Sequence, residues 1–257
     1  MVLKIGLIGC GAIGTIIGNA VKNGRAGESR ITAVFDLAGE KAWELAKKTG
    51  AKKVESIGDL VKKCDLVIEC ASQDAVREYW EAVAGRKDFM VLSVGALLDK
   101  SLLGDMLSKA KKGKTKIYVP SGAVCGLDAV KGAGVGRMDT VQLTTTKPPK
   151  SLGLEVNERK VIFSGTPEEA VVKFPANINV AAALQLASGK VPVKIEIVAD
   201  PEAKLNKHEI IAVGEFGGMA CRTENLPSTE NPKTSALAAM SAVAAIRKIT
   251  ETLVVGT

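Results

Sequence analysis

The sequence predicts an α/β protein in two parts: a doubly wound parallel sheet, then an α+β domain with a largely antiparallel sheet. Over the first 120 residues, short apolar runs alternate with helical patterns, which is typical of a parallel sheet with helices on both faces. From about Pro120 the alternation stops and strand patterns follow one another closely, which favours antiparallel pairing.

The first strand pattern, Val2 to Ile8, runs directly into a glycine-rich turn and a helix that starts at Ala12. In a dinucleotide site the first glycine permits the tight turn, the second lets the pyrophosphate approach, and the third packs helix on strand. The N-terminus of the helix then offers N–H groups to phosphates. The pattern therefore predicts a Rossmann domain whose phosphate-binding backbone comprises Gly9, Gly11, Ala12, Ile13 and Gly14.

A carboxylate follows the second strand pattern, Ile31 to Phe35. Asp36 lies about 20 residues beyond the glycines, where an acidic side chain binds the ribose hydroxyls of NAD. The alternative role for Asp36 is a cap of the helix predicted over Ala38 to Lys48. No arginine follows to receive a 2′-phosphate, which favours NAD, although Lys41 leaves NADP possible.

Four further strand patterns, near Lys52–Val54, Leu66–Cys70, Phe89–Val94 and Lys116–Val119, complete a six-stranded sheet. Ligands of such sheets bind at the carboxyl ends of the strands. We therefore expect cofactor contacts from the residues after the fourth and fifth strands; for the two serines, ordinary loop roles are the alternative. These residues are Ala71, Ser72, Ser93 and Gly95.

The second part begins with a Gly/Ala-rich crossover and is predicted to contain six strands and two helices. The strands are expected at Asp139–Thr146, near Gly153–Val156, and at Lys160–Ser164, Val191–Ala199, Glu209–Phe216 and Gly218–Asn225, the last two forming a hairpin around Gly217-Gly218. The helices are expected at Pro167–Lys173 and Asn177–Ala187. A last helix, Thr234 to about Thr252, should return to the first domain. The predicted domains are thus 1–120 with 234–257 for the dinucleotide, and 121–233 for substrate and dimerisation.

Composition excludes several classes of function. The net charge is +7, but the lysines are scattered and only nine aromatic residues occur, so we expect no nucleic-acid partner. No apolar run reaches membrane-spanning length, and we expect a cytoplasmic protein without a membrane partner. The five cysteines form no CxxC and should be buried or half-buried free thiols. With a single histidine, no metal site is expected.

Three places offer polar groups for chemistry in the second part. His208, the single histidine, suits proton transfer near neutral pH, or is a surface residue at a strand edge. Asn177 and Asn179 open an apolar helix; the first has a capping role open to it, and the second has less structural reason to be there. The start of the last helix, with Lys233, Thr234 and Ser235, is either a carboxylate receptor or a simple cap.

Five motifs in order resemble L-aspartate dehydrogenases of the archaeal type over essentially the whole chain: Gly9-x-Gly11-x-x-Gly14, Ser121-Gly-Ala-Val-Cys-Gly-Leu-Asp128, Phe174-Pro-Ala-Asn-Ile-Asn-Val180, Asp200-Pro with Asn206-x-His208-x-Ile210, and Asn-Pro-x-Thr-Ser235. The resemblance implies oxidation of L-aspartate with NAD or NADP, through iminoaspartate, to oxaloacetate and ammonia, with iminoaspartate feeding NAD biosynthesis. It also implies a homodimer.

The same resemblance implies roles for individual residues. His208 matches the family's active-site histidine. Nicotinamide contacts match Ala123 and the pair Asn177 and Asn179, between which the motif does not choose. Substrate contacts are expected from Ser121, Asn179, Lys233, Thr234 and Ser235. Two other functions stay open from sequence: a related reductase of amino-acid metabolism, of the dihydrodipicolinate or homoserine type, and a non-catalytic NAD-binding protein.

Overall fold

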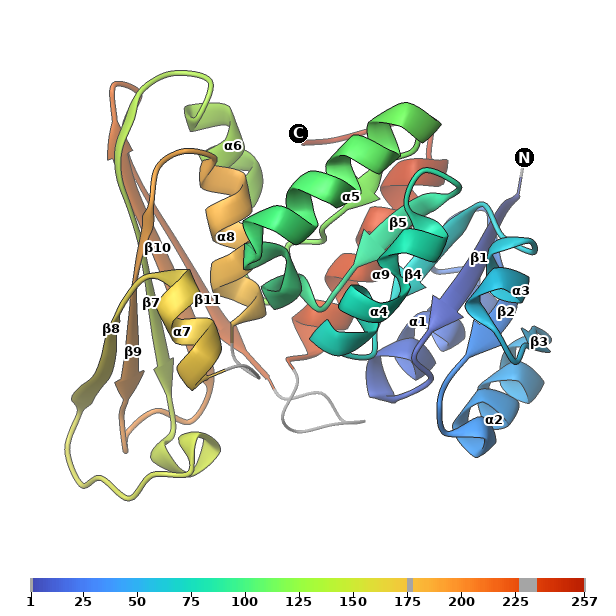
Figure 1. Cartoon of the computed structure of the whole chain (residues 1–257). Coiled ribbons are helices and arrows are strands. Elements are labelled where there is room, and N and C mark those ends of the chain that lie inside the picture. The colour runs from blue at the N-terminus through green and yellow to red at the C-terminus, as the bar shows by residue number, and fades with distance from the viewer. Residues whose placement is uncertain (1, 175–177, 227–234, 257) are drawn as a thin grey trace. The chain divides into compact units, whose positions relative to one another are not determined.

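The computed structural model describes residues 2–174, 178–226 and 235–256, coloured along the chain in Figure 1. They divide into two compact units. The first comprises Met1–Pro120 and Ala239–Val255, and the second comprises Ser121–Ala238 and Gly256–Thr257. None of the helices in the described ranges is long and apolar enough to cross a membrane.

The first unit is built on a six-stranded sheet in the order β3-β2-β1-β4-β5-β6, with every neighbouring pair parallel. The strands are β1 Leu3–Ile8, β2 Ser29–Phe35, β3 Lys52–Lys53, β4 Leu66–Glu69, β5 Asp88–Val91 and β6 Ile117–Tyr118. The predicted doubly wound sheet is therefore confirmed. Its strand order reverses between β1 and β4, and ligands of such sheets bind beside that point.

Helices connect these strands: α1 Ala12–Lys22, α2 Gly39–Thr49, α3 Ile57–Val61, α4 Gln73–Val83, α5 Lys100–Gly113 and the 3₁₀ turn η1 Val94–Leu98 (Figure 1). Side-chain caps and a glycine set the ends of several of these helices. Ser72 and Asp99 cap α4 and α5 by accepting hydrogen bonds from backbone N–H groups, and Gly50 ends α2 in the left-handed conformation. The last helix, α9 Ala236–Thr250, contributes Ala242 and Ile246 to the core that surrounds β1.

The second unit contains a five-stranded sheet in the order β11-β10-β7-β9-β8. Only β7 and β9 run parallel, so the predicted, largely antiparallel sheet is also confirmed. The strands are β7 Met138–Lys147, β8 Lys160–Gly165, β9 Val193–Ala199, β10 Asn206–Gly214 and β11 Gly217–Asn225. The helices are α6 Leu127–Ala133, α7 Pro167–Lys173 and α8 Asn179–Ser188, which packs against β9 and α6 (Figure 1).

Three local expectations were wrong. The strand expected near Gly153–Val156 is absent from this described segment, because Pro149–Leu152 forms a 3₁₀ turn that Gly153 ends at a φ of 70°. The β10–β11 hairpin turns at Glu215 and Phe216, since Gly214 pairs with Gly217. Cys125 is exposed, whereas the other four free thiols are buried or half-buried as expected.

Alternation along β10 divides its side chains between the two faces of the sheet. His208, Ile210 and Ala212 point to one face and are buried, whereas Ile211 and Val213 on the other face are 41% and 44% exposed. The single histidine therefore lies on the covered face of the second unit.

Candidate active site

The glycine turn of the first unit has the geometry of a phosphate cradle. Gly9 has a φ of 97° and its N–H donates to the carbonyl of Phe35, which fixes the turn against β2. A Cβ on Gly14 would lie 2.3 Å from the Gly9 carbonyl oxygen, so only glycine allows α1 this close to the turn. A Cβ on Gly11 would meet no atom within 4 Å. The backbone there faces open space, as a bound pyrophosphate requires.

Asp36 is fixed beside this turn by two hydrogen bonds. Its Oδ2 accepts from the N–H of Cys10 at 2.7 Å and its Oδ1 from the N–H of Ala38 at 2.8 Å. Ala38, not Asp36, occupies the N-cap position of α2, so the capping alternative was wrong. The half-buried carboxylate stands at the end of β2, where the ribose of a dinucleotide lies in this fold. The glycine turn and Asp36 together fit NAD.

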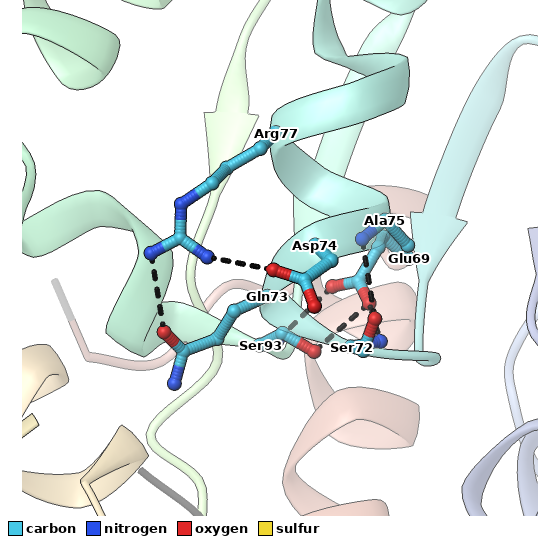
Figure 2. A network of polar contacts seen from close by, with 7 residues as sticks. All are labelled: Glu69, Ser72, Gln73, Asp74, Ala75, Arg77 and Ser93. Atoms are coloured by element: carbon cyan, nitrogen blue, oxygen red, sulfur yellow. Dashed lines mark hydrogen bonds and ion pairs between the residues drawn. The ribbon is translucent and has the colours of Figure 1, made fainter. Parts of the chain in front are cut away.

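Glu69, which we did not single out from the sequence, is the polar centre of the adjacent strand ends (Figure 2). The residue is fully buried at the end of β4. Its Oε1 accepts from the N–H groups of Ala71 and Ser72 at 2.8 and 2.9 Å, and from the Ser93 hydroxyl at 2.9 Å. Its Oε2 accepts from the N–H of Ser93 at 3.0 Å. Burial raises the pKa of Glu69, and the hydrogen bonds from these donors oppose that rise.

The signal for Glu69 was an acidic residue inside an otherwise apolar strand. Its bonds bring together three of the predicted cofactor residues, Ala71, Ser72 and Ser93. The hydroxyl of Ser72 also accepts from the N–H of Ala75 at 3.2 Å, so this serine caps α4 and has a local structural role, the kind of alternative left open for it. Gly95, the fourth, is buried within η1.

His208 in the second unit is buried and fixed by a neighbour. Its Nδ1 lies 3.0 Å from the hydroxyl oxygen of Thr145, directly across the β10–β7 pair, and the residue is 6% exposed. Because β10 has β7 on one side and β11 on the other, the alternative of a surface residue at a strand edge was wrong.

Burial also changes the proton chemistry of His208. Desolvation, and secondarily the charge of Lys147, lower the pKa of the imidazole to about 4. Lys147 lies two residues beyond Thr145 on β7, and burial lowers its own pKa as well. Titration near neutral pH was therefore a wrong expectation: the imidazole is neutral at pH 7 and able to accept a proton.

The crossover segment is attached to the same face of the second sheet. The carbonyl of Ala123 accepts from the Thr223 hydroxyl at 3.0 Å and from the Asn225 side-chain amide at 2.9 Å. Thr223 pairs with His208 across the β10–β11 ladder, opposite Thr145. Ala123 is thereby held by the row of polar side chains that includes the histidine, and Ser121 lies two residues before it.

The remaining predicted residues are only partly described. Asn179 is exposed and is the first residue of α8, with Ile178 at the N-cap, so the helix begins two residues later than expected. Ser235, just before α9, is buried. Asn177, Lys233 and Thr234 lie outside the described residues. Within the described ranges, no three His, Cys, Asp or Glu side chains are grouped to hold a metal ion.

The pKa of His208 gives a first prediction. Between pH 6.5 and about 4 the unfolded chain binds a proton at this imidazole and the folded chain does not. His208 should therefore cost stability progressively as the pH falls through this window, by about 3 kcal/mol in total. As the pH falls from 7 to 4, the free energy of unfolding of the parent should therefore fall relative to that of His208→Asn. Denaturant titrations of both proteins across this range measure the difference.

The single histidine also permits a direct measurement by NMR. Its imidazole resonance should titrate near pH 4, and Lys147→Met should raise this pKa while leaving it below 6.5, because burial is the larger cause. A parent imidazole that titrates above pH 6 would contradict the buried position.

Comparisons with known proteins were made for the whole chain. Residues 128–249 match the family model described as aspartate dehydrogenase, C-terminal, and residues 9–120 match that of the homoserine dehydrogenase NAD-binding domain. L-Aspartate dehydrogenases of Methanococcus maripaludis and Methanocaldococcus jannaschii are 45% and 46% identical. Each comparison covers 99% of this chain and 100% of the relative.

Among solved structures, the aspartate dehydrogenase of Thermotoga maritima is similar with a TM-score of 0.82 and 28% identity, covering 99% of both chains. A scyllo-inositol dehydrogenase of Lactobacillus casei shares the fold at a TM-score of 0.62 and 13% identity. The chain belongs to the L-aspartate dehydrogenase family of oxidoreductases, and its first unit contains an NAD-binding domain.

Proposed function

We propose that this chain oxidises L-aspartate with NAD, through iminoaspartate, to oxaloacetate and ammonia. The full-length identity to L-aspartate dehydrogenases carries the proposal, and the buried, neutral His208 beside Thr145 supplies its chemistry. Release of iminoaspartate before water adds would connect the reaction to NAD biosynthesis.

The cofactor is assigned to the first unit. The backbone of Gly9, Gly11, Ala12, Ile13 and Gly14 binds the pyrophosphate, and Asp36 binds a ribose hydroxyl. NAD, when bound, supplies the hydride acceptor, and the residues of the chain position the reactants. NAD is favoured over NADP because the Asp36 carboxylate would repel a 2′-phosphate. Nicotinamide contacts are assigned to Ser93, Gly95, Ala123, Asn177 and Asn179, and the neighbouring ribose to Ala71 and Ser72.

Proton transfer is assigned to His208. Because its Nδ1 is occupied by Thr145, the other ring nitrogen, Nε2, exchanges protons with the substrate and with water. A pKa near 4 keeps this nitrogen unprotonated at physiological pH, so its lone pair is free to accept a proton as water adds to the imine. The protonated ring then returns the proton readily to the departing amine. Carboxylate binding is assigned to Ser121, Asn179, Lys233, Thr234 and Ser235.

A spectrophotometric assay with the purified chain tests the reaction. NADH should form from NAD with L-aspartate and not with homoserine. His208→Asn, which keeps a polar side chain beside Thr145, should lower kcat by about 10²–10⁴-fold with NADH affinity retained. Turnover within a few-fold of the parent would remove His208 from the mechanism. Tight NADH binding without oxidation of any amino acid would favour the non-catalytic alternative.

Two glycine variants test the cofactor assignment as a matched pair. Gly11→Ala adds a methyl group that meets no protein atom, so the melting temperature should stay unchanged while NADH affinity falls by about tenfold or more. Gly14→Ala forces α1 away from the Gly9 carbonyl and should cost about 1–3 kcal/mol of stability. Equal NADH affinity for the parent and Gly11→Ala would refute the pyrophosphate assignment.

A homodimer is part of this proposal. The exposed Ile211 and Val213 on β10, on the face opposite His208, support an interface there. Sedimentation velocity should find a dimer for the parent and a monomer for the double variant Ile211→Glu, Val213→Glu. A parent that sediments as a monomer at all concentrations would exclude the dimer.

A further inference from the structure

One buried carboxylate joins two loops at the ligand-binding edge of the first sheet. Glu69 accepts two N–H groups from the loop after β4, and the N–H and hydroxyl of Ser93 from the loop after β5. Figure 2 shows the side chain between Ser72 and Ser93, and the residue has no exposed surface. A buried glutamate costs stability unless its oxygens are paired, and here donors from the two loops pair both of them.

The bonds of Glu69 set the position of groups beyond the two loops. Ser72 donates its N–H to Glu69 and caps α4 with its hydroxyl, so the carboxylate determines where α4 begins. Ser93 precedes η1, whose first residues are Val94 and Gly95. Glu69 therefore links the start of α4 to the residue before η1, two elements that also pack against each other.

We propose that Glu69 is a positioning residue for the cofactor, which holds the loops after β4 and β5 in one fixed arrangement for binding. The proposal rests on the function proposed above, which assigns Ala71, Ser72, Ser93 and Gly95 to the cofactor. Glu69 itself is enclosed by its own loops and acts through their backbone. Binding of the cofactor then loses less conformational entropy, because the two loops already have the arrangement of the bound state.

An amide at position 69 tests this arrangement with nearly unchanged volume. In Glu69→Gln the amide oxygen can keep all the bonds of Oε1, to the N–H groups of Ala71 and Ser72 and to the hydroxyl of Ser93. The amide NH₂ then faces the N–H of Ser93, and two donors meet where a donor and an acceptor met before. The variant therefore loses the bond to the Ser93 N–H and weakens the attachment of the β5 loop, while the bonds to the β4 loop are retained.

A matched control exists at the opposite end of the strands, where β5 begins. Asp88 begins β5, and its carboxylate accepts from the N–H of Lys116 at 2.9 Å and from the hydroxyl of Tyr118 at 3.3 Å. It thus bridges neighbouring strands as Glu69 does, but at the amino end of β5, away from the strand ends that bind ligands. Asp88→Asn makes the same exchange of carboxylate for amide without touching the cofactor assignment.

The experiment measures NADH affinity by fluorescence titration, the KM for NAD, kcat, and the melting temperature of the parent and both variants. Glu69→Gln should weaken NADH binding and raise the KM for NAD by about tenfold, with kcat at saturating NAD reduced less. Asp88→Asn should leave the NADH affinity, the KM for NAD and kcat unchanged, whatever its melting temperature. Glu69→Asp, which keeps the charge but shortens the reach, should recover part of the affinity.

The outcomes separate this proposal from the function on which it rests. NADH affinity within twofold of the parent in a folded Glu69→Gln variant would overturn the positioning role while the aspartate assay stands. An equal loss of affinity in Asp88→Asn would show a general effect of stability and overturn it as well. Weakened NADH binding in Glu69→Gln, in a chain that does not oxidise L-aspartate, would retain the positioning role and reject the activity.

Discussion

An ionisable side chain removed from water must find all its partners within the fold, and each unit of this chain contains an example on a strand with neighbours on both sides. Glu69 ends β4 between β1 and β5, and His208 lies on β10 between β7 and β11. The described residues include no buried side-chain nitrogen or oxygen without a partner. Polar atoms in such places are exactingly oriented, because any displacement leaves a hydrogen bond unmade.

The two buried groups meet the demand with different partners. Glu69 is surrounded by hydrogen-bond donors from two loops, which both of its oxygens accept. His208 faces a hydroxyl and the charge of Lys147, which suits a neutral ring that can receive a proton. Desolvation disfavours the charged form of both, and only the donors around the carboxylate counter it. Burial therefore leaves an anchoring carboxyl group in one unit and an unprotonated imidazole in the other.

Much of the first unit could be predicted because its signals are local. The glycine turn, the strand before it and Asp36 are contiguous or closely spaced patterns, and each glycine has a steric reason visible in sequence. The burial of His208 could not be predicted, because it depends on β7 and β11 as neighbours, and strand order is set by distant pairing. The partners of Glu69 come from two loops whose proximity only the parallel sheet creates. The prediction of a strand near Gly153 failed for a local reason, because Pro148 and Pro149 begin a 3₁₀ turn there.

The hold of β11 on Ala123 has a consequence for how the second sheet keeps its alignment. β11 is an edge strand, and edge strands are the ones most prone to slide along their single neighbour. A slip of one residue would turn Thr223 and Asn225 to the opposite face and strip both donors from the Ala123 carbonyl. The crossover at the start of this unit thus stabilises the native register of the edge strand. A shifted register would lose hydrogen bonds to a segment about a hundred residues earlier in the chain.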